Sequence, residues 1–142
     1  MFKKIILKKG NRKINVGTTR LEDGTYKGIL CEVSIRNNRT DSRKINFIFK
    51  FKLKCGNELV NYDQPFVCVD GMPSQRLIDF LNMFYEDIYS TNEEIDLSEL
   101  EETYVQVELQ NQDVNGKSYC NIVRAIILNE DEYKSNDNFE FD

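Results

Sequence analysis

An unbroken alternation over residues 44–54 limits the possible fold of this chain more than any other feature. Side chains alternate between the two faces of a β-strand, whereas an α-helix would scatter the same residues around its axis. The odd positions are all apolar and would share one face: Ile45, Phe47, Phe49, Phe51 and Leu53. The even positions place four lysines on the opposite face: Lys44, Lys50, Lys52 and Lys54. The pattern predicts a strand that covers a core with one face and presents lysines on the other.

Other segments supply the remaining elements. Four more strands are predicted, at residues 25–36, 59–69, 103–110 and 117–128. Residues 74–89 have apolar residues at helical spacing behind Pro73-Ser74, a common way to open a helix. Asn115-Gly116 is a hairpin signal between the last two strands. The basic residues 1–20 are expected to form an extension or short hairpin, and the acidic residues 129–142 a disordered tail.

The order of these elements predicts the fold class. Within residues 21–128, three strands are followed by a helix and a two-stranded hairpin. This is the order of the OB-fold, a mainly β, five-stranded Greek-key barrel with one helix between strands three and four. A ferredoxin-like unit needs a helix after its first strand, and residues 37–43 are too short and polar for one. A purely antiparallel sheet with one helix is the remaining alternative.

Charge is divided unevenly along the chain. Residues 1–54 hold fifteen Lys and Arg against four Asp and Glu, whereas residues 55–142 hold four against twenty. The overall charge of −5 therefore combines a basic part of +11 with an acidic part of −16. Such asymmetry suggests a polyanion-binding surface on one part of the protein.

The lysine face of residues 44–54 is the first candidate for that surface. Like charges this close repel one another unless an anion lies near them. An exposed edge strand, protected against aggregation by its lysines, is the alternative interpretation. Cations from several segments favour a phosphate-binding channel, because four more fall in the loops that flank an OB-fold groove. These are Arg36, Arg39, Arg43 and Lys117.

Aromatic side chains could hold the bases of a bound strand. Stacking on an aromatic ring is worth ~1–3 kcal/mol per base and tolerates any sequence. The chain has no Trp, so stacking would depend on Tyr and Phe. Tyr26, Tyr62 and Tyr119 are the candidates because each has polar or basic neighbours. Each is equally compatible with an ordinary half-buried tyrosine of a strand.

The acidic tail carries six acids and one base and has two phenylalanines among its last four residues. A tail that only solubilises the protein has no use for Phe139 and Phe141. Together with the terminal Asp142, they suit docking into a basic pocket with an apolar floor. That pocket could belong to a partner protein or to the protein's own groove.

Catalysis and metal binding find little support. The chain has no His, no Gly-rich phosphate loop and no paired acidic motif of nuclease type. Its four cysteines form no C-x-x-C pair, so we expect reduced thiols and neither a metal nor another cofactor. No stretch approaches the about 18 apolar residues that span a membrane, and the N-terminus does not match a secretory signal. We expect a cytoplasmic protein without enzymatic activity.

Several short motifs add a family resemblance. Asp96-Leu97-Ser98-Glu99-Leu100 precedes the strand Tyr104-Val105-Gln106-Val107-Glu108. The hairpin Asn115-Gly116-Lys117-Ser118-Tyr119-Cys120-Asn121-Ile122 follows, and Gly24-Thr25-Tyr26 begins the first strand. Over residues 24–128 this layout resembles phage-encoded single-stranded-DNA-binding proteins of the OB-fold type. The tail is similar to the tails by which such proteins recruit replication and recombination proteins, although it lacks their Pro-Phe ending.

These features together predict a non-enzymatic OB-fold protein that coats single-stranded DNA in phage replication or recombination, and they are compatible with a homo-oligomer. The predicted phosphate ligands are Arg36, Arg39, Arg43, Lys44, Lys50, Lys52, Lys54 and Lys117. Two alternatives remain open. The acidic part could mimic nucleic acid and inhibit a host DNA-binding protein, or the OB-fold could bind RNA.

Overall fold

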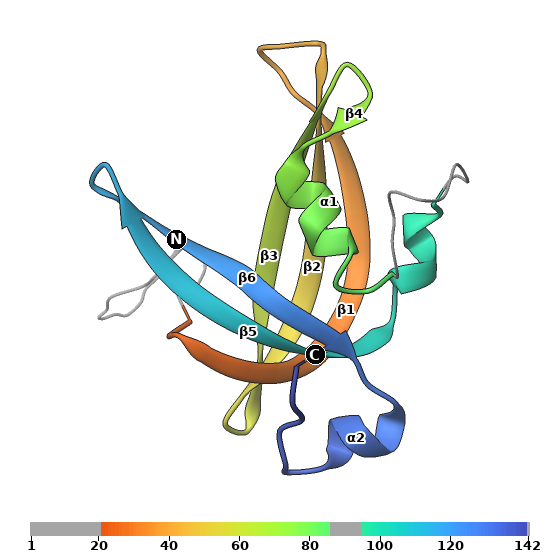
Figure 1. Ribbon diagram of the computed structural model, residues 1–142, viewed down its shortest axis with the longest axis vertical. Coiled ribbons are helices and arrows are strands. Elements are labelled where there is room, and N and C mark those ends of the chain that lie inside the picture. The colour runs from red at the N-terminus through yellow and green to blue at the C-terminus, as the bar shows by residue number, and fades with distance from the viewer. Residues whose placement is uncertain (1–20, 86–94, 142) are drawn as a thin grey trace, which may run out of the picture.

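The computed structural model describes residues 21–85 and 95–141, which form one curved antiparallel sheet with three short helices (Figure 1). The strands are β1 (Gly24–Asn37), β2 (Lys44–Cys55), β3 (Glu58–Val69), β4 (Met72–Pro73), β5 (Thr103–Val114) and β6 (Lys117–Ile127). The helices are α1 (Gln75–Leu81), the 3-10 helix η1 (Leu97–Leu100) and α2 (Glu130–Lys134). The hairpin expected within residues 1–20 lies outside the described residues.

The mainly β class is confirmed, but the sheet differs from a closed five-stranded barrel. It has six strands in the order β4-β3-β2-β1-β5-β6, and it is not closed. The extra strand, β4, has only two residues and pairs with the end of β3. No helix formed by the described residues is long and apolar enough to cross a membrane.

Strand β2 lies in the middle of the sheet and follows the predicted alternation. Phe49, Phe51 and Leu53 are each at most 1% exposed to solvent. The lysines of β2 occupy the opposite face, which we call the outer face of the sheet. Because β2 pairs with β1 on one side and β3 on the other, the interpretation of these lysines as protection of an edge strand is wrong.

Side chains, not a backbone ladder, connect the two long strands that would close a barrel. The Tyr62 hydroxyl on β3 donates to the carbonyl oxygen of Cys120 on β6 at 2.8 Å. Two residues further along both strands, the N–H of Ile122 donates to the Gln64 side-chain oxygen at 3.1 Å. The two strands therefore run in the same direction at this contact, which we call the β3–β6 seam. Gln64 is 2% exposed and Tyr62 is 8% exposed.

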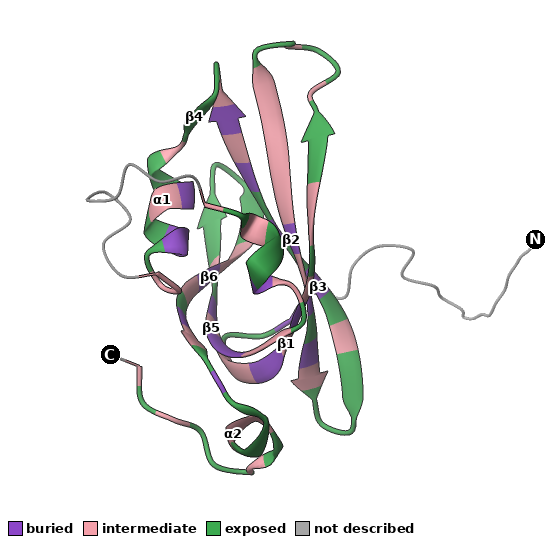
Figure 2. Ribbon diagram, turned by 90° about the vertical axis from the view of Figure 1, so that its right-hand side faces the viewer, coloured by how far each residue is buried: buried purple, intermediate pink, exposed green. Residues whose placement is uncertain are grey.

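Helix α1 covers one end of the core and is shorter than the 74–89 segment predicted for it. The Ser74 side chain caps its first turn by accepting from the N–H of Leu77, and Asn82 ends the helix. Phe80 packs against the rings of Phe49 and Phe66, with centroids 4.8 Å apart in both cases. Figure 2 shows the buried side of α1 turned towards the strands.

The prediction of a disordered tail is wrong for residues 129–141, which fold back onto the sheet. Asn129 and Glu132 form a capping box that begins α2, with Asn129 accepting from the N–H of Glu132 at 2.8 Å. The reciprocal bond runs from the N–H of Asn129 to the Glu132 carboxylate at 2.9 Å. These two bonds satisfy donors that the first turn of a helix leaves free.

Candidate nucleic-acid interface

Five cations lie along the outer face of β1 and β2. Arg36 on β1 lies opposite Asn46, which is two residues from Lys44 on β2. Lys50, Lys52 and Lys54 follow at alternate positions of β2. The row spans about 33 Å, since ten residues of strand advance about 3.3 Å each. We call it the cationic row: Arg36, Lys44, Lys50, Lys52 and Lys54.

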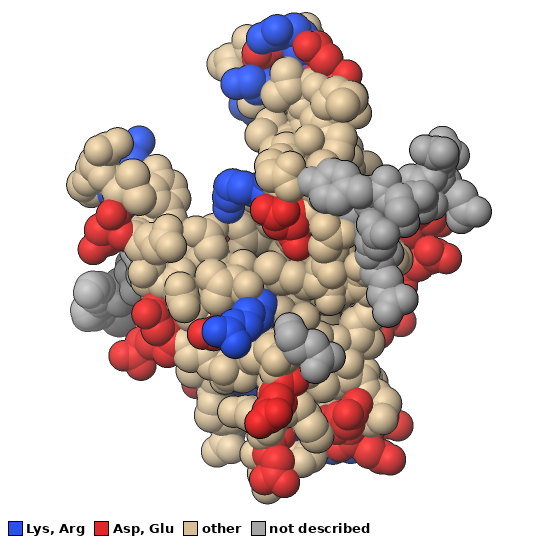
Figure 3. Space-filling model, in the orientation of Figure 1, with Lys and Arg blue, Asp and Glu red and all other residues tan. Residues whose placement is uncertain are grey.

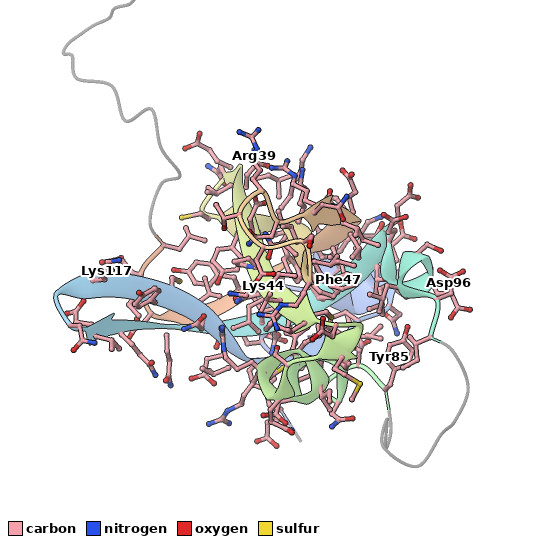
Figure 4. All side chains as sticks on the ribbon, turned by 90° about the horizontal axis from the view of Figure 1, so that it is seen from above. Arg39, Lys44, Phe47, Tyr85, Asp96 and Lys117 are labelled. Carbon is pink, nitrogen blue, oxygen red and sulfur yellow. The ribbon has the colours of Figure 1, made fainter. Side chains whose placement is uncertain are left out.

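The loop between β1 and β2 adds two arginines near one end of the cationic row. The loop is closed by backbone bonds between Asn38 and Lys44 and between Lys44 and Asp41, each 3.1 Å long. Arg39 is exposed and points away from the body of the protein (Figure 4). Arg43 is also exposed but is partly occupied by acids. It contacts Asp41 at 3.2 Å and Asp70 at 3.9 Å.

The pairing of Arg43 with Asp41 also affects the pKa of the Asp41 carboxyl. Hydrogen bonds from the side chain and backbone of Arg43 lower the pKa of Asp41 below its ordinary value of 3.8. Arg43 therefore offers less uncompensated charge to a phosphate than Arg39 does. The end of the row still keeps a net positive charge, because Arg36, Arg39 and Lys44 make no ion pair within the described ranges.

Lys117 lies apart from the row. It is exposed at the start of β6, beside the Asn115-Gly116 turn, where both residues have positive φ angles of 53° and 79°. Figure 4 shows Lys117 at the far end of the β5–β6 hairpin, well separated from Arg39 and Lys44. Tyr119, 47% exposed, is two residues along the same strand. The eight predicted cations therefore do not form one continuous cluster.

Two of the three tyrosines proposed for base stacking have structural roles. Tyr62 is buried in the β3–β6 seam, so its ring cannot receive a base, and that prediction is wrong. Tyr26 packs against the core, and its hydroxyl donates to the carbonyl oxygen of Glu22 at 2.7 Å. Tyr119 alone of the three is exposed.

Sequence reasoning missed a cation beside the seam. A cleft of about 260 Å³ lies between β3, α1 and the β5–β6 hairpin. Arg76 lies at its edge and donates to the Asn121 side-chain oxygen at 3.0 Å, with its guanidinium 5.5 Å from the centre of the Phe66 ring. The only sequence signal was its position just inside the helix that Ser74 caps. Its proximity to β6 depends on a long-range contact.

The tail packs against the outer face of β1 and β5 through backbone atoms. The Lys27 ammonium donates to the carbonyl oxygens of Glu132 and Ser135, both at 2.7 Å. Gln106 donates to the carbonyl oxygen of Phe139 at 2.6 Å and accepts from its N–H at 2.9 Å. Gln106 is 0% exposed and Lys27 is 7% exposed. Burial and the charge of the nearby Lys54 lower the pKa of Lys27.

One end of the tail also engages the cationic row. Tyr133 stacks on Tyr104 with ring centroids 4.4 Å apart. The Lys54 ammonium lies 3.9 Å from the centre of the Tyr133 ring and donates to the carbonyl oxygen of Tyr133 at 3.0 Å. Lys54 is therefore not available to a ligand while the tail is docked.

The two phenylalanines predicted to dock in a basic pocket contact the protein's own cations. The Phe139 ring lies 4.8 Å from the Lys27 ammonium, and the Phe141 ring lies 6.0 Å from the Arg124 guanidinium. Asp142 lies outside the described residues. Neither Lys27 nor Arg124 was predicted as a docking residue. Alternation gave no signal for Lys27, because it shares the odd positions of the first strand with the apolar Ile29, Val33 and Ile35.

Charge is distributed unevenly over the surface. Figure 3 shows Lys and Arg atoms together with some Asp and Glu atoms at the tip of the β1–β2 hairpin, and mainly Asp and Glu atoms around the end of the molecule that carries α2. The four cysteines are free thiols, and the described residues contain no group of three His, Cys, Asp or Glu arranged to hold a metal. A scan against protein-family models and a search of curated proteins give no match to this chain.

Proposed function

We propose that the protein is a non-enzymatic factor that binds single-stranded DNA with little sequence preference, of the type used in phage replication or recombination. The observation that carries the proposal is the cationic row. It holds five like charges on the outer face of two central strands, β1 and β2, where lysines have no role in protecting a sheet edge. A phosphate backbone supplies the anions that such a row lacks.

The strand arrangement supports an OB-fold for this chain. Strand β1 pairs with both β2 and β5, the helix α1 follows β3 and β4, and β3 approaches β6 in parallel at the seam. The OB-fold is a partly open barrel whose second and third strands and flanking loops bind oligonucleotides. Four of the five cations of the row lie on the second strand, Arg39 lies in the β1–β2 loop, and Lys117 follows the turn of the β5–β6 hairpin.

Five cations are proposed to contact phosphates, with Tyr119 as the stacking residue. Arg43 and Lys50 are set aside because acids lie beside them, and Lys54 because the tail occupies it. The remaining set is Arg36, Arg39, Lys44, Lys52 and Lys117. If each neutralises one phosphate, log affinity against log salt should fall with a slope of about −3.5.

A fluorescence titration of single-stranded and duplex oligonucleotides over a range of salt concentrations tests the proposal. We expect tighter binding of the single strand and a slope of about −3.5. Replacing Lys44 and Lys52 together by Ala should make the slope shallower by about 1.4. Replacing Arg76 and Lys134 by Ala removes the same charge elsewhere and should leave the slope unchanged. A salt-independent affinity, or equal effects of both double variants, would contradict the proposal.

Two other functions make different predictions. The acids around α2 favour a protein-interaction module, because Lys27 and Lys54 bind tail carbonyls and leave most tail carboxylates exposed. Such a module would bind no oligonucleotide but would retain a basic DNA-binding protein on an affinity column. An RNA-binding OB-fold would favour the RNA oligonucleotide in competition with DNA of the same sequence.

A further inference from the structure

A pocket of about 360 Å³ opens on the outer face of β1, β2 and β3, in the middle of the cationic row. It exists because β1 has one extra residue there. The register shifts between Leu30 and Glu32, which leaves Cys31 without a partner on β2. The pocket is lined by Cys31, Glu32, Lys50, Phe51, Lys52, Asn61 and Asp63, and we call it the outer pocket.

The outer pocket brings two lysines and two carboxylates together. Lys50 lies opposite Glu32 on β1 and opposite Asp63 on β3. Across the described part of the chain, neither acid forms an ion pair with Lys50 or Lys52. Among the residues that the structure describes, Glu32 accepts only from the Ser34 hydroxyl, at 3.1 Å. Both carboxylates are therefore exposed acceptors inside a row of cations.

Carboxylates beside a phosphate backbone weaken binding by repulsion unless they contact something else on the strand. A carboxylate can only accept hydrogen bonds, and the groups on a nucleic acid that donate to it are base amino and imino groups. The exocyclic amino group of cytosine is a known partner of Asp and Glu, whereas thymine has a carbonyl oxygen at that position and donates only through its ring N3–H. A base in the pocket would also have the Lys50 and Lys52 ammonium groups beside it to hold the adjacent phosphates.

We propose that the outer pocket holds one base of the bound strand and selects bases that carry an exocyclic amino group, with Glu32 or Asp63 as the acceptor. The inference rests on the proposed function and gives it a composition preference. Cytosine-rich strands should bind more tightly than thymine-rich strands of equal length, by about tenfold for one site. Lys50, set aside as a general phosphate ligand because of its acidic neighbours, then acts only next to a seated base.

The test compares oligo-dC and oligo-dT of equal length by fluorescence anisotropy, using the full chain. The wild type should bind oligo-dC about tenfold more tightly. Replacing both Glu32 and Asp63 by Ala should strengthen oligo-dT binding, because repulsion is lost, and should reduce the preference for oligo-dC to near one. Replacing Glu58, an exposed acid at the start of β3 outside the pocket, by Ala should change both affinities by the same factor.

The outcomes separate this inference from the proposed function. A wild type that binds neither oligonucleotide contradicts the proposed function itself. Binding without a preference for oligo-dC, or a preference that survives in the Glu32→Ala, Asp63→Ala double variant, overturns the outer pocket as a base site and leaves general single-strand binding intact. Thermal melting of each variant confirms that it is folded, since all three acids are exposed on the surface.

Discussion

At the scale of single residues, Tyr62 and Gln64 connect strand β3 to strand β6 across the curved sheet. The Tyr62 hydroxyl has two acceptors at 2.8 Å, the carbonyl oxygen of Cys120 and the side-chain oxygen of Gln64. The same Gln64 oxygen accepts from the N–H of Ile122, so the buried polar atoms of the seam satisfy one another. Sequence alone indicated a strand here but not a seam, because the contact joins residues 58 positions apart.

Replacing Tyr62 by Phe should lower the free energy of unfolding by about 1–2 kcal/mol, because it removes a buried hydrogen bond across the β3–β6 seam. Burial, with the nearby Cys120 as the next cause, raises the pKa of the Tyr62 phenol above its ordinary value of 10.0. The native state therefore keeps a proton that the unfolded chain loses above about pH 10. Stability should be intact below that pH and fall as pH rises beyond it.

Denaturant titrations between neutral pH and about pH 11 measure both effects. The alkaline loss of stability should be smaller in the Tyr62→Phe variant than in the wild type. Tyr119→Phe is the matched control, since the side chain of Tyr119 is exposed. An alkaline slope that is the same in the wild type and in Tyr62→Phe would show that this phenol does not set the pH limit.

At the scale of elements, β1 is shaped by two local features. The bulge at Cys31 opens the outer pocket, and Gly28 lets β1 approach β2 closely. A Cβ atom at Gly28 would overlap the Lys52 carbonyl oxygen and would lie 2.7 Å from the Leu53 side chain. Both obstacles are parts of a central strand, so neither can move aside freely.

Replacing Gly28 by Ala should therefore lower the free energy of unfolding by about 1–3 kcal/mol, the usual cost of overpacking a core. Urea denaturation followed by circular dichroism measures the change. Ser34→Ala, on the outer face of the same strand, should cost much less, because its hydroxyl makes only one exposed hydrogen bond. Equal stability of Gly28→Ala and the wild type would contradict the close approach of the two strands.

The elements also show what sequence can and cannot predict. Alternation over residues 44–54 is a local property, and the faces of β2 follow it. The apolar residues at helical spacing continue past Leu81, but α1 ends at Leu81, with Asn82 as its C-cap. The length of a helix depends on its packing against the rest of the protein and not on the hydrophobic period alone. The spacing of Asn129 and Glu132 is that of a capping box, which favours the start of a helix over a disordered tail. The bulge and the outer pocket depend on cross-strand register, which the sequence did not reveal.

At the scale of the whole molecule, the docked tail joins the acidic and basic parts of the chain. It covers Lys27 and engages Lys54, so it occupies cations at one end of the cationic row. A chain that ends at Leu128 should therefore bind single strands more tightly. Its salt slope should become steeper by about 0.7 for each released lysine that reaches a phosphate.

Parallel titrations of the full and shortened chains test this competition. Because truncation also uncovers Gln106, thermal melting must show that the shortened chain is folded. Phe139→Ala in the full chain is a second variant that loosens the tail without removing an acid, with Asn138→Ala as its control. Identical affinity and slope in the wild type, the shortened chain and Phe139→Ala would show that the tail does not compete with DNA.

The connection between β6 and α2 is short, and this affects any protein that binds the C-terminal phenylalanines. Strand β6 ends at Ile127, and Leu128 is already bonded to the Tyr104 carbonyl before the capping residue Asn129 begins the next helix. Such a partner must first wait for, or cause, release of Phe139 from Gln106. Its apparent affinity for the intact protein is then its affinity for the free peptide multiplied by the fraction of molecules with a released tail. A strand that displaces the tail from Lys54 would raise that fraction, so the protein would recruit its partners best when it is loaded with nucleic acid.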